Sequence, residues 1–174
     1  MHKIKTNIMK KMILFAVLGL LTLASCKKSS SPAITTPNTI TATVDGVTYT
    51  CKFLSGSEAE QDSSGTDLWY NYENYAYDSA YNELYLDIKQ LNKAISSKTY
   101  GSQGDSTTEA YVEFDSGGSY WGSVTKINPA TITVTSSGGN TIQGTFQGTL
   151  YNSEDSTSAD KKVITNGKFN ITTP

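Results

Sequence analysis

The feature that most constrains the fold is an Asp-Gly pair between two runs of alternating apolar and polar residues. On either side of Asp45 and Gly46, apolar side chains alternate with Thr or Lys. This setting favours a two-residue type I′ hairpin, whose register gives one shared apolar face. That face holds Ile40, Ala42, Val44, Val47, Tyr49 and Cys51. We therefore expect the domain to begin with a hairpin in which Cys51 is a small buried hydrophobic residue rather than a nucleophile.

Similar alternation recurs along the chain between turns rich in Gly, Ser, Asn and Asp. The inward positions include those of 83–90 (Leu84, Leu86, Ile88), 109–115 (Ala110, Val112, Phe114), 141–151 (Ile142, Phe146, Leu150) and 162–172 (Val163, Phe169, Ile171). The pattern predicts an all-β domain of about 8–10 short strands in an antiparallel β-sandwich. Gly144 and Gly148 fall on an inward face, where they leave space for a facing aromatic or mark a bend. A small closed lipocalin-like barrel is therefore the alternative.

Two stretches are expected to lack strand structure. Residues 55–67 are acidic, and we expect a solvated loop or a short helix there rather than a calcium site, because the ligand spacing of an EF-hand is absent. Residues 91–97 are expected to form one or two helical turns.

The N-terminus predicts export and a lipid anchor. Lysines precede an apolar run from Met12 to Leu23, which is typical of a signal peptide and too short to span a bilayer as a helix. Leu23-Ala24-Ser25-Cys26 has the form of a bacterial lipobox, with cleavage before Cys26 and lipidation of its sulfur. We expect a signal peptide over 1–25, a lipidated Cys26 with a flexible tether over 26–38, and a single all-β domain over 39–174.

Composition removes several classes of function. The fourteen basic residues are all lysines, and loss of four with the signal peptide leaves ten against sixteen acidic residues, a net charge near −6. Such a chain is poorly suited to nucleic acid. The one histidine, His2, lies in the signal peptide, so a mature chain has no Ser-His-Asp or Cys-His site, and with Cys26 lipidated Cys51 has no disulfide partner. We expect no cofactor, no metal and no catalysis.

An aromatic run supplies the candidate ligand-binding residues, which are Trp69, Tyr70, Tyr72, Tyr75 and Tyr77 together with Trp121. Such rings can stack on sugars, but Tyr and Trp also form strands and cover sheet faces without binding anything. The leading hypothesis is a membrane-tethered binding module for a glycan or a protein. A carboxylate-dependent glycoside hydrolase using Glu109, Glu113 or Asp115 is one alternative, and a purely structural envelope protein is another.

Four segments carry a family resemblance. The lipobox, the Thr-Ala-Thr-Val-Asp-Gly-Val run at 41–47, and the segments 142–150 and 164–171 resemble a family of uncharacterised lipoproteins of Bacteroidota. The resemblance implies a small all-β domain in the cell envelope, on an outer-membrane lipoprotein that faces the periplasm or the cell surface. It implies no activity and no catalytic residues.

Overall fold

The computed structural model describes residues 37–53, 58–64, 67–101, 107–123, 130–152 and 159–172. Within these ranges the chain forms strands and no helix, which confirms the all-β class. The strands are β1 (Thr39–Val44), β2 (Val47–Phe53), β3 (Glu58–Ser64), β4 (Asp67–Tyr77), β5 (Glu83–Leu91), β6 (Thr99–Gly101), β7 (Thr108–Ser116), β8 (Ser119–Ser123), β9 (Thr131–Gly138), β10 (Thr141–Asn152) and β11 (Lys161–Thr172). The predicted signal peptide, Cys26 and the tether as far as residue 36 lie outside the described residues.

The first hairpin has the predicted register, but Val47, which was expected on the shared apolar face, is 55% exposed because it lies at the turn. β1 and β2 pair antiparallel with Val44 opposite Val47 and Ile40 opposite Cys51. Asp45 and Gly46 both have positive φ, at 48° and 85°, as a type I′ turn requires. Cys51 is fully buried with a free thiol, and burial raises its pKa to about 12, so it behaves as a core residue.

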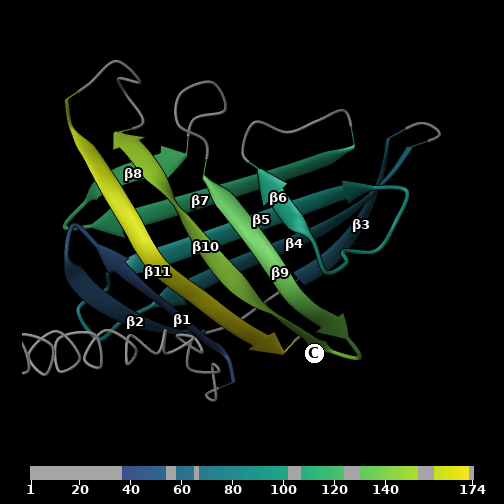
Figure 1. The fold of residues 1–174 in the computed structure, drawn as a ribbon, viewed down its shortest axis with the longest axis horizontal. Coiled ribbons are helices and arrows are strands. Elements are labelled where there is room, and N and C mark those ends of the chain that lie inside the picture. Colours follow the sequence, from purple (N-terminus) through teal and green to yellow (C-terminus); the bar gives the residue numbers. More distant parts are fainter. Residues whose placement is uncertain are drawn as a thin grey trace, which may run out of the picture. The chain divides into compact units, whose positions relative to one another are not determined.

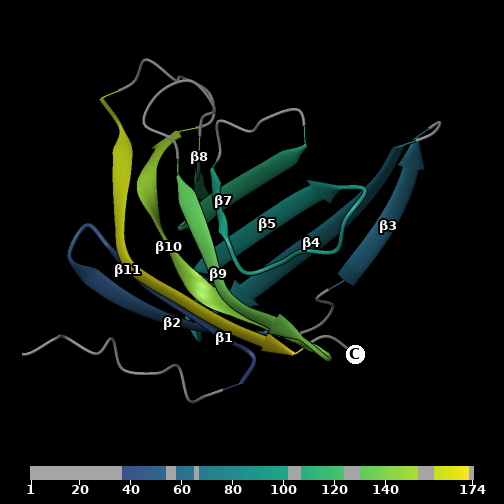
Figure 2. The ribbon, with the colours of Figure 1, turned by 45° about the vertical axis from the view of Figure 1, so that its right-hand side comes forward.

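Eight strands close into an antiparallel barrel. The order is β11-β1-β2-β4-β5-β7-β8-β10, and pairing of β10 with β11 completes the ring. β9 and β6 continue from β10, and β3 pairs with β4 outside the ring. Figures 1 and 2 show β9, β10 and β11 crossing over β4, β5 and β7, so the two groups of strands cover opposite sides of one interior.

The predicted sandwich is wrong and the alternative barrel is correct, because two short seams join the crossing layers. β2 meets β4 through two residue pairs, and β8 meets β10 through three. β10 serves both layers, since it pairs with β9 over Thr141–Gln147 and with β8 from Leu150 onward. Its ladder with β11 is irregular between Phe146 and Gly148, where a bulge and a glycine let the strand bend. Alternation of apolar residues is the same in both architectures and could not decide between them.

The barrel interior holds one hydrophobic core. Its largest fully buried side chains are Tyr100, Phe114, Phe169, Ile40, Leu84, Leu86, Ile88, Ile132, Leu150, Ile164, Ile171 and Val112. Gly144 leaves room for a facing aromatic, as predicted: a Cβ there would lie 2.5 Å from Cζ of Phe169 and 2.2 Å from the carbonyl oxygen of Thr133. The core therefore requires glycine at this position.

Tyr100 fixes the short strand β6 against the barrel. Its hydroxyl donates to Oε1 of Gln90 on β5 at 2.7 Å and accepts from the backbone N–H of Ser96 at 3.0 Å. Since both Tyr100 and Gln90 are buried, these bonds satisfy polar groups inside the interior.

Three local predictions are wrong. Glu58–Ser64 is strand β3 rather than loop or helix, because its backbone pairs with β4 along its whole length. The described chain after β5 runs through bends to β6 without a helical turn. Val163 is exposed and Ile164 is inward, because an irregular ladder near Gly167 and a positive φ at Asn166 reverse the alternation before Phe169.

Candidate functional site

The six predicted ligand-binding residues do not share one face. β4 keeps a continuous register with β5, so its side chains alternate between the barrel interior and the outside. Tyr72 is buried inside, and Tyr70 lies on the same side of the strand. Trp69, Tyr75 and Tyr77 lie on the outer side. The aromatic run therefore places two of these five rings on the inner side of β4 and three on the outer side.

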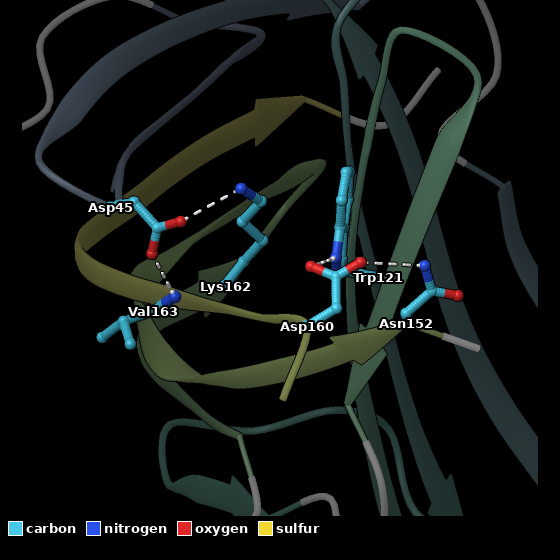
Figure 3. A network of polar contacts seen from close by, with 6 residues as sticks. All are labelled: Asp45, Trp121, Asn152, Asp160, Lys162 and Val163. Carbon is cyan, nitrogen blue, oxygen red and sulfur yellow. Dashed lines mark hydrogen bonds and ion pairs between the residues drawn. The ribbon is translucent and has the colours of Figure 1, made fainter. Parts of the chain in front are cut away.

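Trp121 closes the seam between β8, β10 and β11 (Figure 3). It is 7% exposed, and its Nε1–H donates to Oδ1 of Asp160 at 3.0 Å. The Phe114 ring stacks on it with centroids 6.0 Å apart, and Nζ of Lys162 lies 4.9 Å from its ring centroid. Asn152 Nδ2 donates to the other Asp160 oxygen at 3.1 Å. With its donor satisfied and its ring contacted by two side chains, Trp121 has the environment of a packing residue.

The same network extends to the first hairpin (Figure 3). Nζ of Lys162 lies 3.1 Å from Oδ2 of Asp45, whose Oδ1 accepts from the backbone N–H of Val163 at 2.9 Å. The bond from Val163 and the lysine hold the pKa of Asp45 below its usual value. The network therefore ties the β1–β2 turn to β11 and to the seam residue Trp121.

The outer side of β4, β5, β7 and β8 carries a second concentration of aromatic and acidic side chains, which we call the tyrosine–carboxylate face. Strand pairing arranges it in four rows across the sheet. The rows are Tyr77–Glu83–Asp115–Tyr120, Tyr75–Tyr85–Glu113–Gly122, Glu73–Asp87–Tyr111 and Asn71–Lys89–Glu109. The side chains come from four neighbouring strands that pair one with the next, so the closed barrel holds them in a fixed arrangement.

Tyrosine rings form a continuous ladder across this face. The Tyr75 and Tyr85 rings lie 4.5 Å apart between centroids, and Tyr85 meets Tyr111 edge to face at 6.0 Å. The Tyr111 hydroxyl then hydrogen-bonds that of Tyr120. Tyr75 begins the ladder and is 41% exposed. A ligand would therefore meet a ring already ordered by its neighbours.

Gly122 provides the space in which the Tyr111 hydroxyl lies. A Cβ at this position would be 2.1 Å from Oη of Tyr111 and 3.3 Å from Oη of Tyr120. Gly122 is buried and lies opposite Glu113 in the sheet. Its missing side chain is thus what allows the ladder to pass from β7 to β8.

Asp87 is a carboxylate buried within this face. It is 8% exposed, and its Oδ2 lies 3.3 Å from Nζ of Lys89 while its Oδ1 has no hydrogen-bond partner. Burial raises the pKa of Asp87 to about 6, Lys89 counters the rise, and the charges of Glu73 and Glu109 add to it. One buried acceptor is therefore available to a donor that the described residues do not supply.

Glu113 lies beside it on β7. Its pKa is raised to about 7, chiefly by burial and also by the charges of the nearby Glu83 and Asp115, while hydrogen bonds to Tyr120 and Tyr111 partly counter the rise. A carboxyl group in this state is partly protonated near neutral pH, so it can donate as well as accept a hydrogen bond.

The β4–β5 turn holds one more exposed ring at the end of this face. Oδ1 of Asp78 accepts from the backbone N–H groups of Ala80 and Asn82 at 2.8 and 3.0 Å, and Oδ2 accepts from Nδ2 of Asn82 at 2.8 Å. These bonds hold Tyr81 at a φ of 62° with the residue 81% exposed. A non-glycine residue in this conformation is strained, so the turn holds an exposed aromatic ring at some cost in stability.

Sequence reasoning did not select Asp87, Tyr111 and Tyr120 for this face, whereas Tyr81 and Tyr85 belong to the aromatic run that motivated the binding hypothesis. The signal was present for Asp87, because its outward position on β5 alternates with the inward Leu84, Leu86 and Ile88. Within the described ranges no group of His, Cys, Asp and Glu is arranged to hold a metal ion. Over the same ranges, no helix has the length and apolar character needed to cross a membrane.

Comparisons with protein-family models, curated proteins and solved structures find no match to this chain.

Proposed function

We propose that this protein is a lipid-anchored, non-catalytic binding module of the cell envelope, and that its tyrosine–carboxylate face holds a glycan or protein ligand. The lipobox at Cys26 and the resemblance to Bacteroidota lipoproteins support the anchor. The tether that follows would leave the barrel free to face the periplasm or the cell surface.

The observation that carries the binding role is the tyrosine ladder, with Tyr75 exposed at one end. Burying an aromatic ring against a ligand is favourable, and here the rings lose little freedom because Tyr75 and Tyr85 already pack together on rigid strands. Tyr81 adds a second exposed ring next to this face.

The test is a double substitution of the exposed rings. Tyr75→Ala with Tyr81→Ala is compared with Val47→Ala plus Val163→Ala, which removes exposed apolar surface on other strands. Both variants are assayed by glycan array and by titration with defined protein segments. Loss of at least tenfold in affinity in the tyrosine variant alone supports the proposal. Equal binding by both variants and the unaltered protein contradicts it.

A carboxylate-dependent glycoside hydrolase is the second candidate, because Glu113 has the raised pKa expected of a general acid and lies next to the row that holds Glu83 and Asp115. A panel of glycosides tests it with Glu113→Gln and Asp115→Asn. Turnover that both substitutions abolish supports this candidate, and absence of turnover leaves the binding role.

The anchor has its own test. Protein extracted from membranes is analysed by intact mass, and whole cells are treated with protease. A mass for residues 26–174 plus acyl groups supports lipidation at Cys26, and a mass without lipid contradicts it. Protease sensitivity separates surface display from a periplasm-facing barrel.

A further inference from the structure

The tyrosine–carboxylate face carries a large excess of negative charge. Its carboxylates are Glu73, Glu83, Asp87, Glu109, Glu113 and Asp115, against Lys89 within the face and Lys52 of β2 beside Tyr77 at its edge. Only Asp87 has an ion pair with Lys89 among the described contacts. Like charges this close repel one another in the free protein, and a cation placed among them relieves that repulsion.

Asp87 indicates independently that this face lacks a hydrogen-bond donor. Its Oδ1 is buried, yet no group in the described part of the chain donates to it. A buried carboxylate oxygen without a donor is costly, and an ammonium or guanidinium group satisfies it with a charge-assisted hydrogen bond. The protein has no arginine of its own to do so.

The rings beside Asp87 suit the same kind of ligand. Tyr85 precedes it by two residues on β5, and Tyr111 lies opposite it on β7. The negative face of an aromatic ring attracts a cation, and Tyr75 offers such a face at the solvent side of the ladder. Carboxylates and tyrosine rings together thus favour an organic cation.

We propose that the tyrosine–carboxylate face receives lysine or arginine side chains from a basic segment of a partner protein. This rests on the proposed binding function and specifies its ligand. A neutral glycan would use the rings but leave the excess of negative charge on this face uncompensated, and no described set of side chains is arranged for a metal ion. Charge complementarity therefore favours a basic peptide segment as the occupant.

The experiment measures binding of labelled peptides to the detergent-solubilised full chain. Three twelve-residue probes alternate glycine with arginine, lysine or glutamine, and a neutral glycan array is run in parallel. We expect the arginine and lysine probes to bind, more weakly as salt rises, and the glutamine probe not to bind. Binding of the glutamine probe with equal affinity overturns the proposal.

Substitutions distinguish binding at this face from the non-specific attraction of basic peptides to an acidic protein. Asp87→Asn and Tyr75→Ala are each expected to weaken the basic probes at least tenfold. Asp45→Asn removes one negative charge at the β1–β2 turn, away from this face, and is expected to change affinity less than twofold. Similar weakening by Asp45→Asn and Asp87→Asn overturns the proposal.

The same assay distinguishes this inference from the proposed function. Binding of a neutral glycan that Tyr75→Ala abolishes and Asp87→Asn preserves, with no binding of basic probes, overturns the cationic ligand and keeps the binding face. Absence of binding by every probe overturns both.

Discussion

Substitution of Gly122 by alanine tests whether the Tyr111 hydroxyl occupies the space that this glycine leaves. The added Cβ would lie 2.1 Å from Oη and 3.0 Å from Cζ of Tyr111, so the ring must move. Movement breaks the hydrogen bond to Tyr120 and the edge-to-face contact with Tyr85. Each interaction contributes about 1 kcal/mol, and crowding in a packed site costs a similar amount.

We therefore expect Gly122→Ala to lower the free energy of unfolding by about 1–3 kcal/mol, which corresponds to a fall in Tm of roughly 3–10 °C. Thermal and urea unfolding provide the measurement. Gly138→Ala is the matched control, because Gly138 is also in a strand and a Cβ there meets nothing within 4 Å. Its stability should change by less than about 0.5 kcal/mol.

A double substitution identifies the clash. Tyr111→Phe removes the atom nearest to the new Cβ, so the loss in Gly122→Ala plus Tyr111→Phe should be smaller than the sum of the two single losses. Strict additivity, or equal stabilities for Gly122→Ala and Gly138→Ala, would refute the described position of the hydroxyl.

Three further predictions follow from the site and the seam. Burial raises the pKa of Asp87 to about 6 and that of Glu113 to about 7, so the folded state holds protons more tightly than the unfolded state. The free energy of unfolding should therefore fall by about 2 kcal/mol, after allowance for solvent screening, as pH rises from about 4 to 7. In urea unfolding, Glu113→Gln should reduce this dependence of stability on pH. Tyr81→Gly should raise stability by up to about 1 kcal/mol by relieving the positive φ, while weakening ligand binding, and a loss of stability would contradict the strain. Trp121→Phe should cost about 1–2 kcal/mol by removing the donor to Asp160, and combination with Asp160→Ala should add little further loss.

Sequence periodicity predicted much of the fold because side chains alternate strictly wherever a strand is regular. The hairpin at Asp45-Gly46 and the inward residues of β5 and β7 follow from this rule alone. It failed at β11, where the bulge near Gly167 places Ile164 rather than Val163 inside. A one-residue irregularity leaves no clear trace in composition. It nevertheless exchanges the inward and outward side chains at every strand position that precedes it.

Closure of the barrel depends on long-range pairing that local pattern does not specify. The short contacts of β2 with β4 and of β8 with β10 make the difference between a sandwich and a barrel. Glu58–Ser64 shows the same limit, because an acidic and polar segment becomes a strand only by pairing with β4. Strand propensity is weak compared with such tertiary context.

The aromatic run picked out by the sequence overlaps the tyrosine–carboxylate face on β4. Treating the run as one platform combined inward rings such as Tyr72 with outward rings such as Tyr75. Tyr111 and Tyr120 reach the same face from β7 and β8, and only the strand order brings them there. Trp121 faces the interior for the same reason, since its neighbours Tyr120 and Gly122 lie on the outer side.

The central claim is that the tyrosine–carboxylate face is occupied by a ligand in the cell envelope. Hydroxyl-radical footprinting with mass spectrometry tests it without knowledge of that ligand, by comparing the protein in native membranes with the purified protein. The account predicts that Tyr75 and Tyr81 are protected in membranes, while the exposed Val47 and Val163 react equally in both samples. Equal reactivity of the two tyrosines in membranes and in the purified protein would contradict it.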